Sequence, residues 1–166
     1  GGAVWMNAGA WGSDVSQRVI EIRCLNSDGS VVIVPASRLK AGYRHCGAVT
    51  DRIVLSARFR LDTGRGKEIL NKILEHRERK KWMLKLHSAG SVFKNPAADY
   101  AGRLIESAGL KGMHVGGAEV SRRHANVIGM KKRGMTSDFL ALMRIVRDRV
   151  AEKTGVLLEP EVISLG

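Results

Sequence analysis

Cysteine is scarce in this chain of 166 residues, which contains only Cys24 and Cys46. Two thiols without metal-ligand spacing argue against a disulfide framework and a zinc site, so we expect reduced cysteines and no metal. Aromatic residues are also few, at 5%, which disfavours the stacking platforms that bind single-stranded nucleic acid. No apolar run approaches the roughly 20 residues of a membrane span, and no charged-then-apolar leader opens the sequence. These absences predict a cytoplasmic globular protein without a membrane partner.

Positive charge dominates the sequence, with 28 Lys and Arg residues against 16 Asp and Glu residues and a formal net charge of +12. The basic residues gather at 76–81, 122–123 and 131–133. Such a balance suits phosphate-bearing ligands, either nucleotide cofactors or nucleic acid, and it also favours solubility. None of these clusters forms a continuous basic helix face, so we expect no nucleic-acid partner.

The first part of the chain has the alternating pattern of β-strands. Residues 18–25 alternate in polarity, and an Asp-Gly turn within 26–29 connects them to the apolar residues 31–34. This pattern predicts a β-hairpin. Residues 53–61 alternate again, which predicts a half-buried strand. We therefore expect a β-rich unit over residues 1–61.

Helical spacing follows in the middle of the chain. Residues 65–82 carry apolar side chains on one stripe and Lys and Arg on the other, which predicts an amphipathic helix. Asn95 and Pro96 are typical of the N-cap and first residue of a second helix. Gly109 is expected to end that helix in the left-handed conformation.

The last helix is predicted over residues 137–154, with Ser137 as its N-cap and Gly155 as its end. Its apolar stripe has the spacing of a core-facing helix. Residues 156–163 then predict a strand that Pro160 interrupts.

Residues 88–96, with the sequence Ser-Ala-Gly-Ser-Val-Phe-Lys-Asn-Pro, are the most informative stretch. Small residues allow the backbone to approach a ligand, while Ser91 offers a hydroxyl and Lys94 a cation. If Asn95 begins a helix, its N-terminus also favours negative charge. The stretch could hold an anionic substrate and pass it a proton, although an ordinary loop entering a helix would have the same composition.

Three other places contain weaker candidates. Residues 1–12 hold seven Gly or Ala residues, which would let main-chain N–H groups approach a diphosphate, but they match neither a dinucleotide-binding fingerprint nor a P-loop. Arg44 carries a planar fork of donors suited to a carboxylate, and a surface ion pair is the alternative. His124 is by itself compatible with a partly buried core histidine.

These segments together resemble the UDP-N-acetylenolpyruvoylglucosamine reductase (MurB) family of bacterial peptidoglycan synthesis. The resemblance covers essentially the whole chain and rests on motifs in the family's order. The motifs are the glycine-rich opening, Tyr43-Arg44, residues 88–96 and residues 159–162, with further similarity at 101–112, 116–118 and 121–126.

The resemblance implies an α+β fold with a defined division. It assigns residues 1–62 to the second, β-rich half of a two-part FAD-binding domain and residues 63–80 to a linking helix. It assigns 81–155 to a substrate-binding domain, followed by a C-terminal strand over 156–166 that carries a catalytic glutamate. Because the chain opens on Gly1-Gly2 without an initiator Met, we expect a fragment that lacks the first part of the FAD-binding domain.

The resemblance also implies an activity, the FAD-dependent and NADPH-driven reduction of UDP-N-acetylglucosamine enolpyruvate to UDP-N-acetylmuramate. Its catalytic residues would be Arg44, Ser91 and Glu161. The implied contacts to the UDP-sugar substrate are Tyr43, Lys94, Asn95 and His124, and those to FAD are Gly1, Gly2, Asn7, Ala8, Gly9 and Ala10. Two alternatives remain open, a non-catalytic nucleotide-sugar binding module and a basic nucleic-acid binder.

The chain departs from the family pattern at three places. Cys46 stands where the family usually has Ser, and a thiol is a weaker hydrogen-bond partner than a hydroxyl. Trp82-Met83 replaces a Gln-Pro pair shortly before residues 88–96. Ile163 occupies a position where a basic residue is common.

Overall fold

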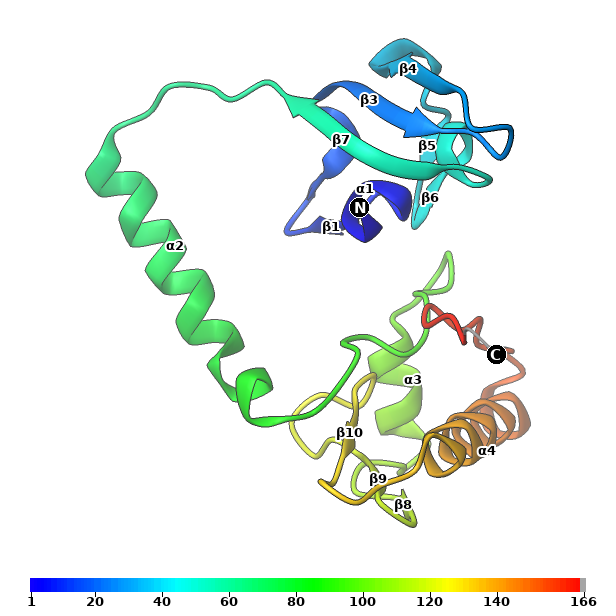
Figure 1. Cartoon of the computed structure of the whole chain (residues 1–166). Helices are drawn as coiled ribbons and strands as arrows, with labels where there is room; N and C mark the ends of the chain where they lie inside the picture. Colours follow the sequence, from blue (N-terminus) through cyan, green and yellow to red (C-terminus); the bar gives the residue numbers. More distant parts are fainter. Residues whose placement is uncertain (165–166) are drawn as a thin grey trace. The chain divides into compact units, whose positions relative to one another are not determined.

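The computed structural model describes residues 1–164, apart from the side chain of Lys85, and the chain divides into two compact units (Figure 1). We call Gly1–Arg65 unit 1 and Gly66–Gly166 unit 2. Unit 1 is mostly antiparallel sheet, whereas unit 2 combines helices with a small antiparallel sheet. The predicted α+β class is confirmed.

Unit 1 is built on a three-stranded antiparallel sheet in the order β4-β3-β7, with two short hairpins beside it. Its elements are α1 (Gly2–Trp5), β1 (Gly9–Ala10), β2 (Ser13–Asp14), η1 (Val15–Gln17), β3 (Val19–Leu25), β4 (Val31–Pro35), η2 (Ala36–Arg38), β5 (Ala41–Gly42), β6 (His45–Cys46), η3 (Gly47–Val49) and β7 (Ile53–Phe59).

The predicted hairpin of unit 1 is confirmed, because β3 and β4 pair antiparallel with Ile22 opposite Val34. Its turn closes locally. Asp28 Oδ1 accepts a hydrogen bond from Ser30 N–H at 2.9 Å, and Gly29 has φ +82°, a conformation that glycine adopts without strain. The predicted strand near residue 53 is also confirmed as β7, which pairs with β3.

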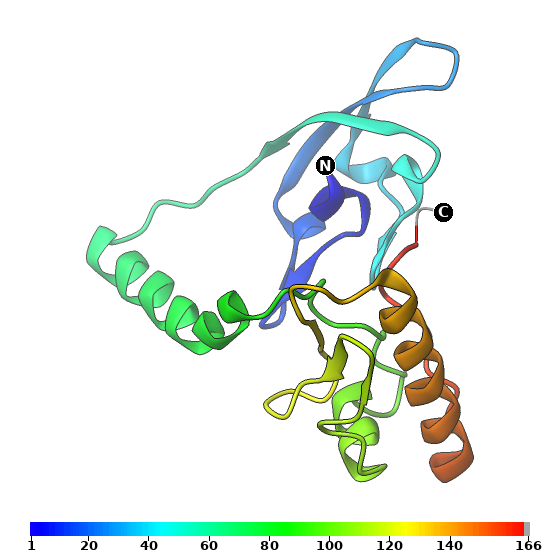
Figure 2. The same ribbon diagram turned by 60° about the horizontal axis from the view of Figure 1, so that its bottom comes forward.

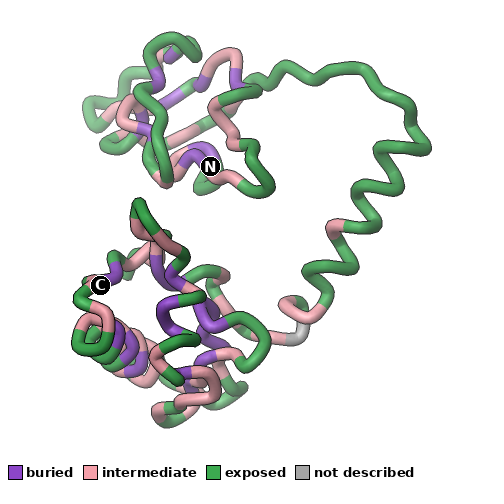
Figure 3. The backbone as a smooth tube through the Cα atoms, turned by 180° about the vertical axis from the view of Figure 1, so that it is seen from behind, coloured by how far each residue is buried: buried purple, intermediate pink, exposed green. Residues whose placement is uncertain are grey.

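One face of this sheet is buried and the other is not. The buried cluster contains Ile22, Cys24 and Val49, which are 1% exposed or less. The other face presents large apolar side chains to solvent, with Ile33 at 63% and Ile53 at 64% exposure. Figure 3 shows the resulting mixture of buried and exposed backbone within unit 1. Unit 1 therefore encloses a core on only one side of its sheet.

Unit 2 carries the longer helices and a sheet of three short strands in the order β10-β9-β8. Its elements are α2 (Gly66–Lys80), η4 (Lys81–Lys85), α3 (Ala101–Ser107), β8 (His114–Val115), β9 (Ala118–Val120), β10 (Ile128–Met130) and α4 (Thr136–Thr154).

The core of unit 2 lies between its small sheet and two of its helices. Helices α3 and α4 run side by side (Figure 2), and Lys153 Nζ near the end of α4 donates to Ser107 O at the end of α3 at 2.7 Å. The stripe Leu142, Val146 and Val150 on α4 is buried to 1% exposure or less. This is the apolar face that the helical spacing predicts. Helix α2 confirms the predicted amphipathic helix but has no buried residue (Figure 3).

Two predicted helix starts are wrong. Asn95 and Pro96 do not begin a helix, since residues 96–99 form a turn in which Asp99 N–H donates to Pro96 O at 3.3 Å, and α3 begins at Ala101. Asn95 Oδ1 nevertheless accepts from Ala101 N–H at 3.0 Å. The amide thus satisfies a free donor of the helix from six residues upstream.

Helix α4 begins at Thr136 with Met135 as its cap, one residue before the predicted start at Ser137. The side chain that stabilises this end is Asp138, whose Oδ2 accepts from Met135 N–H at 3.1 Å and from Gly117 N–H at 2.8 Å. The predicted end is confirmed, because Gly155 has φ +71°. Gly109 also has the predicted left-handed conformation, with φ +77°.

The segment after α4 is not a strand over its described residues, which corrects the prediction for 156–163. It is extended and makes one isolated antiparallel bridge, between Pro160 and Phe93. Pro160 itself has no N–H to donate, and the backbone bonds that its neighbours Glu159 and Glu161 make with residues 92–94 do not extend into a longer ladder.

Candidate functional site

Residues 91–94 form the centre of the candidate site in unit 2. On one side they lie along the segment that enters β10. Val92 N–H donates to Asn126 O at 2.9 Å, and Ser91 and Val127 form an isolated antiparallel bridge. Val92 is buried, whereas Ser91 is exposed. The backbone next to the Ser91 hydroxyl is therefore held while the side chain faces solvent.

On its other side the same loop lies along the chain after α4. Lys94 N–H donates to Glu159 O at 2.8 Å, and Glu161 N–H donates to Val92 O at 2.8 Å. The loop is thus bonded on both edges, as the middle strand of a sheet would be. This pairing brings two predicted catalytic residues, Ser91 and Glu161, to neighbouring backbone positions in unit 2.

The buried side chain of Asn126 holds the loop through hydrogen bonds to its backbone. Its side chain is 3% exposed, and its Oδ1 accepts from Phe93 N–H at 2.9 Å while its Nδ2 donates to Phe93 O at 2.8 Å. Phe93 is itself 1% exposed. A buried backbone group left without a partner costs about 1–3 kcal/mol, so removal of these two hydrogen bonds should lower the stability of unit 2. No local sequence pattern indicates that Asn126 is a functional position.

A pocket of about 380 Å³ opens beside the loop and brings together three predicted residues, Ser91, Asn95 and His124. Arg103 also lines it and is paired with Asp99, to which its Nε donates at 2.6 Å. The hydrogen bonds from Arg103 are the main cause that lowers the pKa of Asp99 to about 2. Polar side chains from the loop, from α3 and from the segment before β10 thus line one pocket of unit 2.

Lys94 is engaged in an ion pair. Its Nζ contacts Glu159 Oε1, and the Lys94 side chain is 29% exposed. The same two residues are joined through their backbones, so the pair reinforces the contact between the loop and the C-terminal segment. A role of Lys94 in binding an anionic substrate would require exchange of this carboxylate partner for the substrate.

His124 belongs to a small stacked cluster. Its ring lies parallel to the Trp82 ring within 14°, with ring centroids 6.4 Å apart. Arg123 Cζ lies 5.5 Å from the centroid of the same indole ring, within reach of a cation–π contact. Trp82, one of the departures from the family pattern, therefore supports the side chains of both basic residues.

In unit 1 the Tyr43-Arg44 pair forms the two-residue tip of the β5–β6 hairpin. Arg44 has φ +55°, and its guanidinium lies 4.9 Å from the Tyr43 ring centroid. The hairpin is anchored by Asn7, which is 4% exposed: its Nδ2 donates to Gly42 O at 3.0 Å, and its Oδ1 accepts from Ser16 N–H at 2.9 Å. Asn7, predicted as a cofactor contact, is placed as an internal support.

The remaining residues of the glycine-rich opening differ in accessibility. Gly1 and Gly2 are exposed, with α1 starting at Gly2, and a Cβ at Gly2 would meet nothing within 4 Å. Gly9 lies in the β1–β2 hairpin, where a Cβ would come within 3.0 Å of Ser13 O. A side chain at Gly9 would therefore crowd the partner strand. Gly1, Gly2 and Ala10, in contrast, are exposed. Ala8 is half-buried.

Both cysteines lie in the core of unit 1 as free thiols. Burial raises the pKa of the Cys24 thiol and of the Cys46 thiol. Cys46 Sγ donates a weak hydrogen bond to Leu39 O at 3.7 Å. The Cys46 thiol therefore faces inward and contributes to packing.

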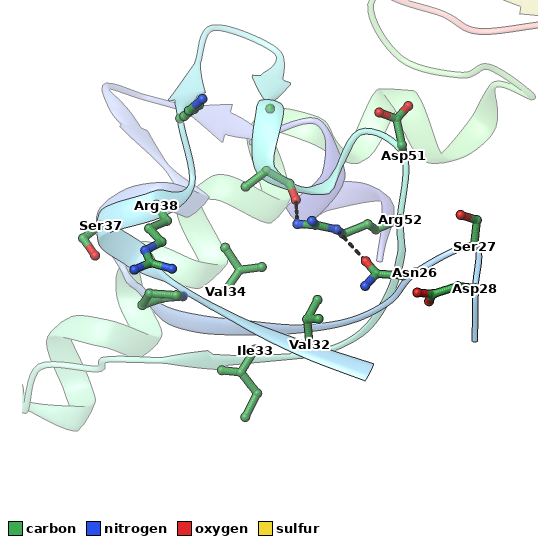
Figure 4. Close-up of a pocket in the computed structure, with 14 residues that line it drawn as sticks. Asn26, Ser27, Asp28, Val32, Ile33, Val34, Ser37, Arg38, Asp51 and Arg52 are labelled. Atoms are coloured by element: carbon green, nitrogen blue, oxygen red, sulfur yellow. Dashed lines mark hydrogen bonds between the residues drawn. The ribbon is translucent and has the colours of Figure 1, made fainter. Parts of the chain in front are cut away.

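A hollow of about 930 Å³ also opens in unit 1 beside β4 (Figure 4), and none of the predicted site residues lines it. Arg52 forms part of its wall, held by a bond from its Nε to Asn26 Oδ1 at 2.8 Å and from its Nη1 to Ala48 O at 2.6 Å (Figure 4). Arg52 thereby connects the β3–β4 turn to η3.

Two classes of site have no counterpart in the part of the chain that the structure describes. Within residues 1–164, no helix has the length and apolarity needed to cross a bilayer. In the same range, no three His, Cys, Asp or Glu side chains come together in a way that could hold a metal ion.

Comparison with known proteins identifies the family to which this chain is similar. The family model for the C-terminal domain of UDP-N-acetylenolpyruvoylglucosamine reductase matches residues 82–165, which include the loop, the pocket and Glu161. The chain belongs to this family. The UDP-N-acetylenolpyruvoylglucosamine reductases of Lactococcus lactis subsp. cremoris strain MG1363 and Agathobacter rectalis are each 41% identical to it over 170 residues and 100% of this chain.

A solved structure agrees with the sequence relatives. The crystal structure of the MurB reductase from Thermus caldophilus superposes with a TM-score of 0.85 at 35% identity, over 98% of this chain and 59% of that one. The chain spans 56% of the Lactococcus relative and 54% of the Agathobacter relative. The match thus extends over both units and over little more than half of each of these three relatives.

Proposed function

We propose that this chain forms the substrate-reducing part of a UDP-N-acetylenolpyruvoylglucosamine reductase, acting in the cytoplasm on a UDP-sugar in peptidoglycan synthesis. The observation that carries the proposal is the loop at residues 91–94. It places the Ser91 hydroxyl at a pocket with Asn95 and His124, and it is bonded through Val92 O to the backbone of Glu161.

The proposed roles follow from the charge that develops during reduction of an enolpyruvyl ether. Hydride addition at C3 leaves negative charge at C2 and in the carboxylate, so the reaction needs a cation for the carboxylate and a proton donor at C2. We assign the first role to Arg44 and the second to the Ser91 hydroxyl. Glu161 is assigned to the enol as a hydrogen-bond partner or proton source. Tyr43, Lys94, Asn95 and His124 are assigned to substrate binding.

FAD, reduced by NADPH, would supply the hydride when bound. The exposed main chain at Gly1, Gly2 and Ala10 fits a ligand that lies along the backbone, and small residues there leave room for it. Ala8 and Gly9 would contribute backbone beside it. Asn7 would act by supporting this segment and the Tyr43-Arg44 hairpin, since both ends of its amide are bonded within unit 1.

Two measurements test the proposal. The first is the visible absorption spectrum after addition of FAD and removal of excess, for this chain alone and for a chain extended to the length of its Lactococcus relative. The second is titration of each protein with UDP-N-acetylglucosamine. Retained flavin and NADPH-dependent turnover of the enolpyruvyl substrate in the extended protein support a reductase. Binding of the UDP-sugar without turnover in that protein would instead indicate a non-catalytic nucleotide-sugar module.

The role of Ser91 is tested by Ser91→Ala in the extended protein. Loss of one donor to developing charge typically costs about 2.7–4 kcal/mol at the barrier, so we expect turnover to fall roughly a hundredfold to a thousandfold. Ser88→Ala, three residues before Ser91 and outside the 91–94 loop, is the control and should keep its turnover. Equal turnover of Ser91→Ala and wild type under conditions where chemistry limits the rate would rule out Ser91 as the proton donor.

A further inference from the structure

The geometry of Ser91 depends on backbone that the loop itself does not fix. Gly90, directly before it, has φ +87° and no atom within 4 Å of the place a Cβ would occupy, so packing does not restrain the chain there. The Ser91 side chain is exposed. Restraint comes instead from the bridge between Ser91 and Val127 and from the hydrogen bonds of the residues that follow, Val92 and Phe93.

The restraint at Phe93 is a pair of hydrogen bonds between the side-chain amide of Asn126 and the backbone N–H and C=O of Phe93. Asn126 accepts from Phe93 N–H and donates to Phe93 O, across 33 positions of sequence and in a buried environment. Its own carbonyl oxygen accepts from Val92 N–H at 2.9 Å. An Asp side chain would lack the donor, and an apolar side chain would lack both groups. Only an amide supplies a donor and an acceptor at this spacing.

Asn126 also acts on the other side of the pocket. Its backbone N–H donates to His124 Nδ1 at 3.3 Å, which leaves the ring proton of the neutral imidazole on Nε2. His124 is exposed, and its ring lies beside the stacked Trp82 and beside α3, where a Cβ at Gly102 would lie 3.4 Å from His124 Cε1. The residue that holds Phe93 thus also donates to Nδ1 of His124, which favours one tautomer of that ring.

We propose that Asn126 is the positioning residue of the candidate site: its side chain fixes the backbone that carries Ser91, and its N–H selects the Nε2–H form of His124. His124 then offers a hydrogen-bond donor to an acceptor oxygen of the substrate. The consequence for catalysis rests on the proposed function, whereas the two structural effects of Asn126 do not.

The test is nuclear magnetic resonance of the 166-residue chain and its Asn126→Asp and Asn126→Ala variants. In wild type we expect slow exchange of the Phe93 amide and of the Asn126 side-chain amide, and a single His124 tautomer in long-range ¹H–¹⁵N spectra. Both variants should exchange the Phe93 amide about tenfold to a hundredfold faster. Both should also show mixed His124 tautomers, because the N–H of residue 126 is aimed at Nδ1 only while the side chain holds that peptide.

The control is Ile105→Val, which removes a methyl group from a fully buried residue of α3 and weakens unit 2 without touching these bonds. The proposal is supported if the Asn126 variants lose more exchange protection at the Phe93 amide than this control does, and if they also lose the single His124 tautomer. Exchange and tautomer patterns equal to the control would overturn it. So would rapid exchange of the Asn126 side-chain amide in wild type, which decides the matter even if a variant does not fold.

The same samples separate this inference from the proposed function. Titration of wild type with UDP-N-acetylglucosamine should shift the Ser91, Asn95 and His124 resonances, and the Asn126 variants should need at least tenfold more ligand for the same shifts. A wild-type chain with the expected exchange and tautomer that shows no shifts would count against the proposed function and leave the positioning role standing. Unchanged affinity in the variants would contradict a role of this positioning in substrate binding.

Discussion

Unit 1 and unit 2 differ in how completely they bury their apolar side chains. In unit 2 the apolar faces of α3, α4 and the β8–β10 sheet meet in one cluster, in which Ile105, Leu142 and Val150 have no exposed surface. In unit 1 one face of the β4-β3-β7 sheet covers a core, while the other leaves Ile33 and Ile53 more than 60% exposed. Unit 2 therefore has the core of an independently stable body, and unit 1 has a one-sided core.

The segments that carry the candidate site residues also differ between the two units in how they are hydrogen-bonded. The Ser91 loop of unit 2 is bonded on both edges and from beneath by Asn126. The Tyr43-Arg44 tip of unit 1 is a two-residue turn between the short paired strands β5 and β6, and the Asn7 side chain donates to Gly42 O beside it. Chemistry that needs a fixed proton donor is better served by the first arrangement, since misplacement of a reacting group is costly.

The largest predicted effect comes from trimming an apolar residue in each unit. Leu142→Ala should lower the free energy of unfolding of unit 2 by about 2–5 kcal/mol, because it leaves a cavity in a closed core. Ile33→Ala, on the open face of unit 1, should change stability by no more than about 0.5 kcal/mol. Hydrogen exchange read separately for peptides of each unit measures both. Similar losses for the two variants would break the contrast between the cores.

Glycine substitutions probe close packing in each unit. A Cβ at Gly117 would lie 2.3 Å from Gly134 Cα, so Gly117→Ala forces two backbones apart and should cost about 3 kcal/mol. Gly9→Ala in unit 1 meets Ser13 O at 3.0 Å and should cost about 1 kcal/mol. Gly66→Ala, which meets nothing within 4 Å, is the control. Thermal unfolding should rank them in that order, and a neutral Gly117→Ala would contradict the close approach of Gly117 to Gly134.

Acid should weaken unit 2 through Asp138. Hydrogen bonds from Gly117 N–H and Met135 N–H hold the pKa of Asp138 below its ordinary value of 3.8. Because the folded-state pKa is lower than the unfolded one, the carboxylate contributes stability above pH 3.8 that is lost as pH falls through the folded value. Chemical unfolding at neutral pH and near pH 3 should show a smaller acid loss in Asp138→Asn than in wild type.

Unit 1 offers a matched acid test. The Ser16 hydroxyl, with backbone N–H groups of Ser16 and Gln17, lowers the pKa of Asp14. Asp14→Asn should therefore reduce the acid sensitivity of unit 1 and leave that of unit 2 unchanged. If either variant altered the acid response of both units equally, the units could not be treated as separate in stability.

The smallest expected signal is the reactivity of the thiols, which also measures the opening of unit 1. Both cysteines lie in unit 1, and burial raises the pKa of each, so the native chain should react with a thiol reagent at least about a hundredfold more slowly than free cysteine. If labelling is nevertheless faster than hydrogen exchange in the core of unit 2, the core of unit 1 opens more readily than that of unit 2. Labelling slower than that exchange would reverse this order.

Most regular elements were predictable because their signals are local. The alternation in β3, the Asp28-Gly29 turn and the apolar stripe of α4 each depend on residues a few positions apart. One failure occurred where a distant group competes with a local signal. Asn95 has the composition of an N-cap, but the chain turns after Pro96, and the amide satisfies the first N–H of α3 from six residues away.

The sequence by itself determined the family, the α+β class and the residue types of the candidate site, since these depend on short motifs and on periodicity. Tertiary structure decided which of those residues share a pocket and what holds them. Asn126 carries no local signal of its role, because its two side-chain bonds reach a loop 33 positions earlier in the chain. The placement of Glu161 beside Val92 likewise follows from pairing between segments that only folding brings together.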